Sequence, residues 1–153
     1  MSATATDRII ALRRLIAAPG PALFIGPRGS GKTEAAREIA GALGVDLRRV
    51  DLATLSSRYI GETEKNLNRL FDAAARDGAL LIFDEADALF GKRTDVRDAH
   101  DRYANIEASY LLSKIEAHPG ATIVAVDSRE ALDPAIVSRF GAVIEFHSPT
   151  DQG

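Results

Sequence analysis

A glycine-rich stretch between an apolar run and a helical run is the segment best suited to chemistry. Residues 24 to 40 read FIGPRGSGKTEAAREIA and match the pattern G-x-x-x-x-G-K-[ST]. Glycines let several backbone N–H groups turn toward one anion, and the N-terminus of the following helix adds positive potential. The stretch therefore predicts a cradle for the phosphates of a nucleotide, made by Gly26, Pro27, Arg28, Gly29, Ser30, Gly31, Lys32, Thr33 and Glu34.

Two side chains of this stretch have roles that follow from their chemistry. The Lys32 ammonium group is expected to reach the β- and γ-phosphates, and the Thr33 hydroxyl is expected to hold Mg²⁺. The alternative is a glycine turn that happens to precede a helix. That alternative leaves both the lysine and the threonine unexplained.

Hydrolysis also needs a carboxylate on the metal side and a group that activates water, and residues 79 to 87, ALLIFDEAD, supply both. The apolar run predicts a strand, and Asp84 at its end would lie at the carboxyl edge of the sheet, where ligands bind in open α/β folds. We assign Asp84 to Mg²⁺ and Glu85 to the general base, a role worth about 10² to 10⁴-fold in rate. The alternative is a helix N-cap and a first-turn acid near Ala86, which does not account for the strand.

The elements that position these residues alternate along the chain. Apolar runs are separated by amphipathic stretches, which is typical of parallel strands joined by crossover helices in an α/β fold. We predict strands at 22–26, 47–51, 79–84, 121–126 and 142–146, and helices at about 32–43, 63–76, 101–117 and 134–138. The charged segment 91–100 has no apolar periodicity and predicts an exposed loop.

Composition limits the classes of partner. The 153 residues include 19 basic and 22 acidic side chains, for a net charge of −3, so nucleic-acid binding would need a local basic patch and is not expected. No cysteine is present, which excludes disulfides and thiolate metal sites and is compatible with a reducing cytoplasm. We therefore expect a cytoplasmic protein.

The first 20 residues predict a helix and a linker. Arginines interrupt each apolar run, which excludes a secretory signal and a membrane span, whereas a mitochondrial presequence stays open as an alternative. Pro19-Gly20-Pro21 is expected to end the helix. The apolar residues that fall mostly on one face of this helix are Ile9, Ile10, Leu12, Leu15 and Ile16.

Together with the two motifs above, the segments YIGETEKNL, DEADALFGKR and DRYANIEASYLL resemble the AAA+ ATPases, over residues 20 to 149. The resemblance implies a P-loop NTPase fold with a five-stranded parallel sheet of order 5-1-4-3-2 between helices. It implies ATP bound with Mg²⁺ at a subunit boundary within a ring, usually a hexamer. It also divides the chain into an N-terminal helix and linker (1–20), a large α/β subdomain (21–150) and a tail (151–153), with no room for the family's helical lid.

The same resemblance assigns roles to residues outside the cradle. Tyr59, Ile60 and Gly61 look like the first pore loop, which grips an extended polypeptide, and 91–100 looks like the second. The alternatives are a tyrosine packed in a core and a merely solvated loop. Arg139 looks like the arginine finger that reaches the γ-phosphate held by a neighbouring subunit; the alternative is a surface arginine paired with an acid.

One position departs from the family. Where the family has an asparagine at the tip of the fourth strand, this chain has Asp127 or, in another alignment, Ser128. An ionised aspartate accepts hydrogen bonds only and would repel the γ-phosphate, so turnover is expected to be slow. We therefore predict a Mg²⁺-dependent ATPase core of a ring-forming motor that remodels polypeptides. The alternative is a nucleotide-dependent switch or scaffold with weak or no hydrolysis.

Overall fold

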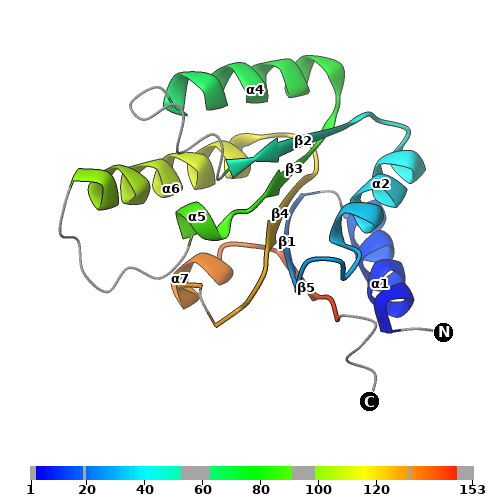
Figure 1. The fold of residues 1–153 in the computed structure, drawn as a ribbon. Helices are drawn as coiled ribbons and strands as arrows, with labels where there is room; N and C mark the ends of the chain where they lie inside the picture. Colours follow the sequence, from blue (N-terminus) through cyan, green and yellow to red (C-terminus); the bar gives the residue numbers. More distant parts are fainter. Residues whose placement is uncertain (1–2, 19, 53–62, 91–98, 131, 148–153) are drawn as a thin grey trace.

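The computed structural model describes residues 3–18, 20–52, 63–90, 99–130 and 132–147 (Figure 1). The residues of the predicted first pore loop, Tyr59, Ile60 and Gly61, lie outside the described residues. Most of the predicted second pore loop, at 91–98, also lies outside them.

Five parallel strands form one sheet, with the order β2-β3-β4-β1-β5. Read from the other edge this is 5-1-4-3-2, so the predicted fold and strand order are confirmed. Chain order and spatial order differ, so β1 lies between β4 and β5 while β3 lies between β2 and β4. The strands are β1 (Pro21–Ile25), β2 (Leu47–Asp51), β3 (Leu80–Asp84), β4 (Thr122–Val126) and β5 (Ala142–Glu145).

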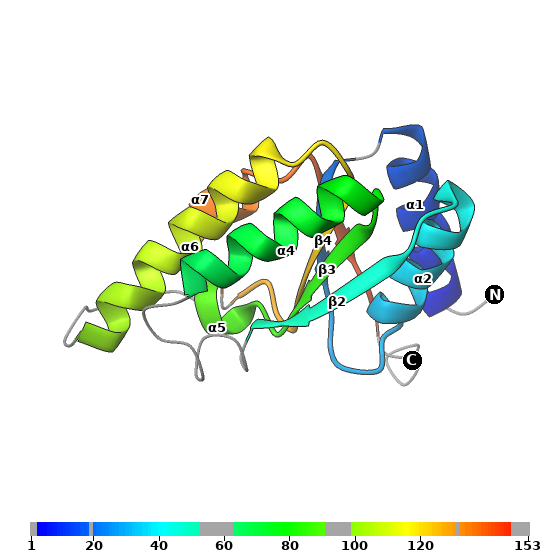
Figure 2. The same cartoon turned by 90° about the horizontal axis from the view of Figure 1, so that it is seen from above.

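Helices cover both faces of the sheet (Figures 1 and 2). Helices α1 (Ala3–Ala17) and α2 (Lys32–Leu43) lie on one face, and α4 (Thr63–Asp77) and α6 (Ala99–Ala117) lie on the other. Two four-residue helices, α5 (Asp87–Phe90) and α7 (Pro134–Val137), lie on the side of α6. Helix α5 was not predicted from the sequence, whereas the equally short α7 was predicted at 134–138.

The central strands are buried on both sides because successive side chains point to opposite faces. In β1, Leu23 and Ile25 join the core under α4 and α6, whereas Ala22 and Phe24 join the core under α1 and α2. The same alternation runs through β3 and β4. The continuous apolar runs of the sequence are therefore explained by a sheet covered on both faces.

The N-terminal helix buries a narrower face than the sequence suggests. Leu15 is buried as expected and Leu12 packs against the same core, but Ile10 and Ile16 are 41% and 40% exposed. Ala11 is fully buried, and with Leu15 four residues later it forms the line that packs against this core. In the described part of the chain, no helix is both long enough and apolar enough to cross a lipid bilayer.

His118, just after α6, lies in a partly buried setting that changes its acid–base equilibrium. Its ring lies edge-on to Phe71 with centroids 5.5 Å apart, and its Nε2 atom is buried with no hydrogen-bond partner. Asp72 and Lys114 line the same small hollow. Burial lowers the pKa of His118 below its ordinary value, because a charged imidazolium loses hydration there.

We expect acid to destabilise this end of α6. Below the unfolded pKa of about 6.5, the unfolded chain binds a proton that the folded chain still excludes, so the free energy of unfolding falls as the pH decreases through that value. The thermal midpoint measured from pH 7.5 to 5.5 should therefore fall less steeply in His118→Gln than in the wild type. Equal slopes in the wild type and His118→Gln would refute this account.

Candidate nucleotide-binding site

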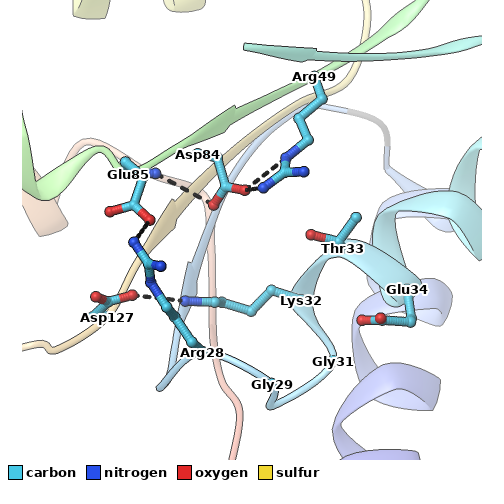
Figure 3. A pocket seen from close by; sticks show the side chains of 10 residues that line it. All are labelled: Arg28, Gly29, Gly31, Lys32, Thr33, Glu34, Arg49, Asp84, Glu85 and Asp127. Carbon is cyan, nitrogen blue, oxygen red and sulfur yellow. Dashed lines mark hydrogen bonds and ion pairs between the residues drawn. The ribbon is translucent and has the colours of Figure 1, made fainter. Parts of the chain in front are cut away.

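A cleft of about 250 Å³ opens at the carboxyl edge of the sheet (Figure 3). It lies between the glycine-rich loop and the first turn of α2 on one side and the ends of β2, β3 and β4 on the other. This is the edge at which ligands bind in open α/β sheets. The lining residues are Arg28, Gly29, Gly31, Lys32, Thr33, Glu34, Arg49, Asp84, Glu85 and Asp127.

The shape of the loop depends on its glycines. Gly29 and Gly31 have φ angles of 82° and 99°, a region that residues with a Cβ atom rarely adopt. A Cβ atom on Gly26 would lie 2.6 Å from the carbonyl oxygen of Phe146, so no larger residue fits there without movement. Gly31 is also the N-cap of α2, which aims the first N–H groups of the helix at the cleft.

Six of the nine residues predicted to bind the nucleotide line the cleft. The other three, Gly26, Pro27 and Ser30, do not line it. Ser30 is fully buried beneath the loop, and its hydroxyl would lie 2.9 Å from a Cβ atom on Gly26. These three residues form or support the loop rather than the wall of the cleft.

The fold holds Lys32 at the floor of the cleft. The residue is only 8% exposed, and its ammonium group donates to the carbonyl oxygens of Gly26 and Val126, the latter at 2.9 Å. Val126 is the last residue of β4, and Gly26 directly follows β1, the neighbouring strand. The same nitrogen lies 3.5 Å from Oδ1 of Asp127 (Figure 3). A positive charge is therefore fixed where the loop meets the sheet.

The acidic pair at the end of β3 faces the loop across the cleft (Figure 3). Oδ1 of Asp84 accepts a hydrogen bond from the Glu85 N–H at 3.3 Å. Glu85 has a φ of 57°, which is uncommon for a residue other than glycine, and its carboxylate contacts the Arg28 guanidinium. The backbone turn thus brings Glu85 to the loop, and helix α5 begins only at Asp87. This arrangement favours the prediction of two cleft acids over the alternative of helix-capping residues.

Asp127, not Ser128, lines the cleft beside Lys32. Ser128 does not line this cleft but a second hollow, to which Asp127 also contributes. The N–H of Asp127 donates to both carboxylate oxygens of Asp87, each at 3.2 Å, so Asp87 orients the turn after β4. Asp87 could not be linked to this contact from the sequence, because its partner is 40 residues away in the chain.

Charges of opposite sign pair across the cleft. Its lining has three basic and four acidic side chains, and the pairs are Arg28 with Glu85, Arg49 with Asp84, and Lys32 with Asp127. Among the described residues, no group of three or more histidine, cysteine, aspartate or glutamate side chains could hold a metal. The Thr33 hydroxyl and the Asp84 carboxylate, which both line the cleft, fit Mg²⁺, because Mg²⁺ is commonly bound by one or two protein oxygens together with substrate phosphates. A glycine cradle next to one carboxylate and one hydroxyl therefore fits Mg²⁺ with a polyphosphate.

Arg139 lies outside this cleft. Its side chain is about half exposed, and its Nε atom donates to Oε1 of Glu116 at 2.7 Å. The contact corresponds to the alternative interpretation of a surface arginine paired with an acid. The guanidinium is nevertheless at the surface, and an arginine finger that acts on a neighbouring subunit also has to lie at the surface.

Comparison with known proteins identifies the family of this chain. The family model described as ATPase family associated with various cellular activities (AAA) matches residues 22–148. An uncharacterized AAA family ATPase, y4kL, from Sinorhizobium fredii is 40% identical over 83% of this chain and 38% of its own length. Proteasome-activating nucleotidase 1 of Haloferax volcanii is 32% identical over 88% of this chain and 35% of its own.

A cell division cycle protein 48 homolog from Archaeoglobus fulgidus is 30% identical over 88% of this chain and 19% of its own length. The chain thus spans well under half the length of each of these relatives. The residues that the family model matches contain the glycine-rich loop, the acidic pair and nearly all of the parallel sheet. The family model covers most of the chain, so the chain belongs to the AAA family of ATPases and is an ATP-binding α/β domain of that family.

Proposed function

We propose that this domain binds Mg·ATP in the cleft and hydrolyses it. The observation that carries the proposal is the convergence of Lys32, from the start of α2, and of Asp84 and Glu85, from the end of β3, on one cavity. A phosphate cradle alone would support binding only. The acidic pair opposite it adds the carboxylate for the metal and the general base that hydrolysis requires.

Each cleft residue then has one task. The loop N–H groups and the Lys32 ammonium bind the phosphates, and the Thr33 hydroxyl and Asp84 hold the metal. When bound, Mg²⁺ would neutralise part of the negative charge that develops on the phosphate oxygens. Glu85 accepts the proton of the attacking water, and Arg28, next to Glu85, turns toward the phosphates once they are bound.

A slow enzyme or a switch is the second candidate, and Asp127 favours it. Its carboxylate lies 3.5 Å from the Lys32 ammonium and offsets part of the charge that should attract phosphate. An ionised carboxylate also cannot donate a hydrogen bond to the γ-phosphate. A domain that binds ATP and hydrolyses little of it would recruit a partner in its ATP-bound state.

We further propose that the domain is the motor core of a cytoplasmic ring, usually a hexamer, that acts on a polypeptide. Similarity to a proteasome-activating nucleotidase and to a cell division cycle protein 48 homolog supports this. Two pore loops stay predictions: the first, at Tyr59, Ile60 and Gly61, would hold that polypeptide, and the second would lie at 91–100. The division of the chain into 1–20, 21–150 and 151–153 also stays a prediction. Nucleic acid and membrane are not proposed as partners.

Lys32→Ala tests the cradle. We expect the affinity for a fluorescent ATP analogue to fall by about 10- to 100-fold, the equivalent of one lost hydrogen bond from a charged donor. Phosphate release should fall with it. Lys114→Ala, which removes a lysine from α6 outside the cleft, should keep wild-type affinity. Thermal unfolding of both variants checks that they fold, and wild-type affinity in folded Lys32→Ala would reject the proposed site.

A further inference from the structure

Arg49 is the cleft residue whose role the family resemblance does not supply. It comes from β2, the edge strand next to β3. Its Nε atom donates to Oδ2 of Asp84 at 2.8 Å, and its Nη2 atom lies 2.5 Å from the same oxygen (Figure 3). The other Asp84 oxygen accepts the Glu85 N–H. Both oxygens of the carboxylate assigned to the metal therefore have partners within the chain.

We propose that Arg49 is a positioning residue that neutralises Asp84 while no metal is bound, and that the guanidinium has to leave before Asp84 can serve Mg²⁺. The inference rests on the proposed metal role of Asp84. Its consequence is competition, because the positive guanidinium occupies Oδ2 of Asp84 with two contacts and repels a divalent cation that approaches the same carboxylate. The site's affinity for metal is thus lower than Asp84 and Thr33 alone would give.

The exposed fractions of the two side chains indicate which of them moves when the ion pair breaks. The Asp84 side chain is 16% exposed and lies at the end of a strand in the interior of the sheet, whereas the Arg49 side chain is 58% exposed on the edge strand. Arg49 can swing into solvent without disturbing the core, and Asp84 cannot. Because the guanidinium is already mostly exposed, breaking its ion pair with Asp84 costs little free energy.

The charge balance of the cleft supports the same role. Arg28 and Lys32 already face Glu85 and Asp127, so Asp84 without Arg49 would be an uncompensated carboxylate beside two other acids. Like charges that line one cleft repel one another. Arg49 therefore offsets the charge of Asp84 and keeps its carboxylate in place, ready for exchange with a metal that carries twice the charge.

The test is metal affinity rather than turnover. Mn²⁺ serves as the probe, and its binding is followed by electron paramagnetic resonance with the protein saturated with ADP. We expect Arg49→Gln to tighten Mn²⁺ binding by about two- to fivefold, the range that corresponds to an ion pair with an exposed partner. Arg49→Lys, which keeps the charge but loses the second contact, should fall between the wild type and Arg49→Gln.

The matched control is Arg48→Gln. Arg48 is the neighbouring residue on β2 and pairs with Asp77 outside the cleft, so its loss should leave Mn²⁺ affinity unchanged. Asp84→Asn should weaken Mn²⁺ binding, and in that background Arg49→Gln should have no further effect. Thermal unfolding confirms that each variant is folded at the temperature of the titration.

The outcomes separate two failures. If Asp84→Asn weakens Mn²⁺ binding but Arg49→Gln leaves it unchanged or weaker, the competition is refuted while the metal role of Asp84 stands. If Asp84→Asn leaves Mn²⁺ affinity at the wild-type value, the metal assignment in the proposed function is wrong and the competition is refuted with it.

Discussion

Replacing Glu85 with glutamine is expected to lower ATP turnover by about 10² to 10⁴-fold while ATP still binds. The amide keeps the size of the side chain and an oxygen that can accept from Arg28, so the backbone turn at φ 57° should persist. What is lost is the carboxylate that takes the proton of water. The measurement is single-turnover phosphate release, together with the dissociation constant of a fluorescent ATP analogue.

The control for this variant is Glu64→Gln, which neutralises an exposed acid in the first turn of α4, outside the cleft. Its turnover should match that of the wild type. If Glu85→Gln releases phosphate at the wild-type rate, Glu85 is not the general base. If Glu85→Gln loses binding as well, its main task is to hold Arg28 and the loop rather than to activate water.

Arg139→Ala is expected to lower turnover by about 10³ to 10⁵-fold in the assembled protein, the range for arginine fingers in other phosphoryl-transfer enzymes. The guanidinium does not line the cleft of its own subunit, so its effect has to be exerted on a neighbour. Specific activity of the wild type should therefore rise with protein concentration, whereas Arg139→Ala should stay low at every concentration.

Mixing variants distinguishes action on a neighbour from action within one subunit. A subunit with Arg139→Ala keeps an intact cleft, and a subunit with Glu85→Gln keeps an intact Arg139. A mixture of the two should release phosphate faster than either variant alone. No gain on mixing would contradict the proposed action across a subunit boundary.

Glu116→Ala tests the alternative of a structural ion pair at the surface. The exposed contact between Glu116 and Arg139 contributes about 0 to 1 kcal/mol of stability at most. If the pair is only structural, Glu116→Ala and Arg139→Ala should shift the thermal midpoint equally and leave turnover unchanged. For a finger, only Arg139→Ala should abolish turnover, because Glu116→Ala merely frees the guanidinium.

Much of the fold could be predicted from local pattern. Buried parallel strands are apolar on both faces, so runs such as ALLIF and TIVAV were recognisable, and all five predicted strands are present within a residue or two. The strand order came with the family resemblance rather than from the runs themselves. The short helix α5 and the exposure of Ile10 and Ile16 were not predictable, because they depend on what packs against each segment.

The sequence by itself determined the chemistry of this protein: a glycine-rich loop with Lys32 and Thr33, and a strand that ends in Asp84 and Glu85. Backbone flexibility, charge and strand periodicity are properties of adjacent residues, so a linear pattern contains them. Only the tertiary structure decided which distant groups face these residues. Arg49 reaches Asp84 and Asp127 reaches Lys32 because β2, β4 and the loop converge at one sheet edge, and ion pairs across such distances leave no local signature.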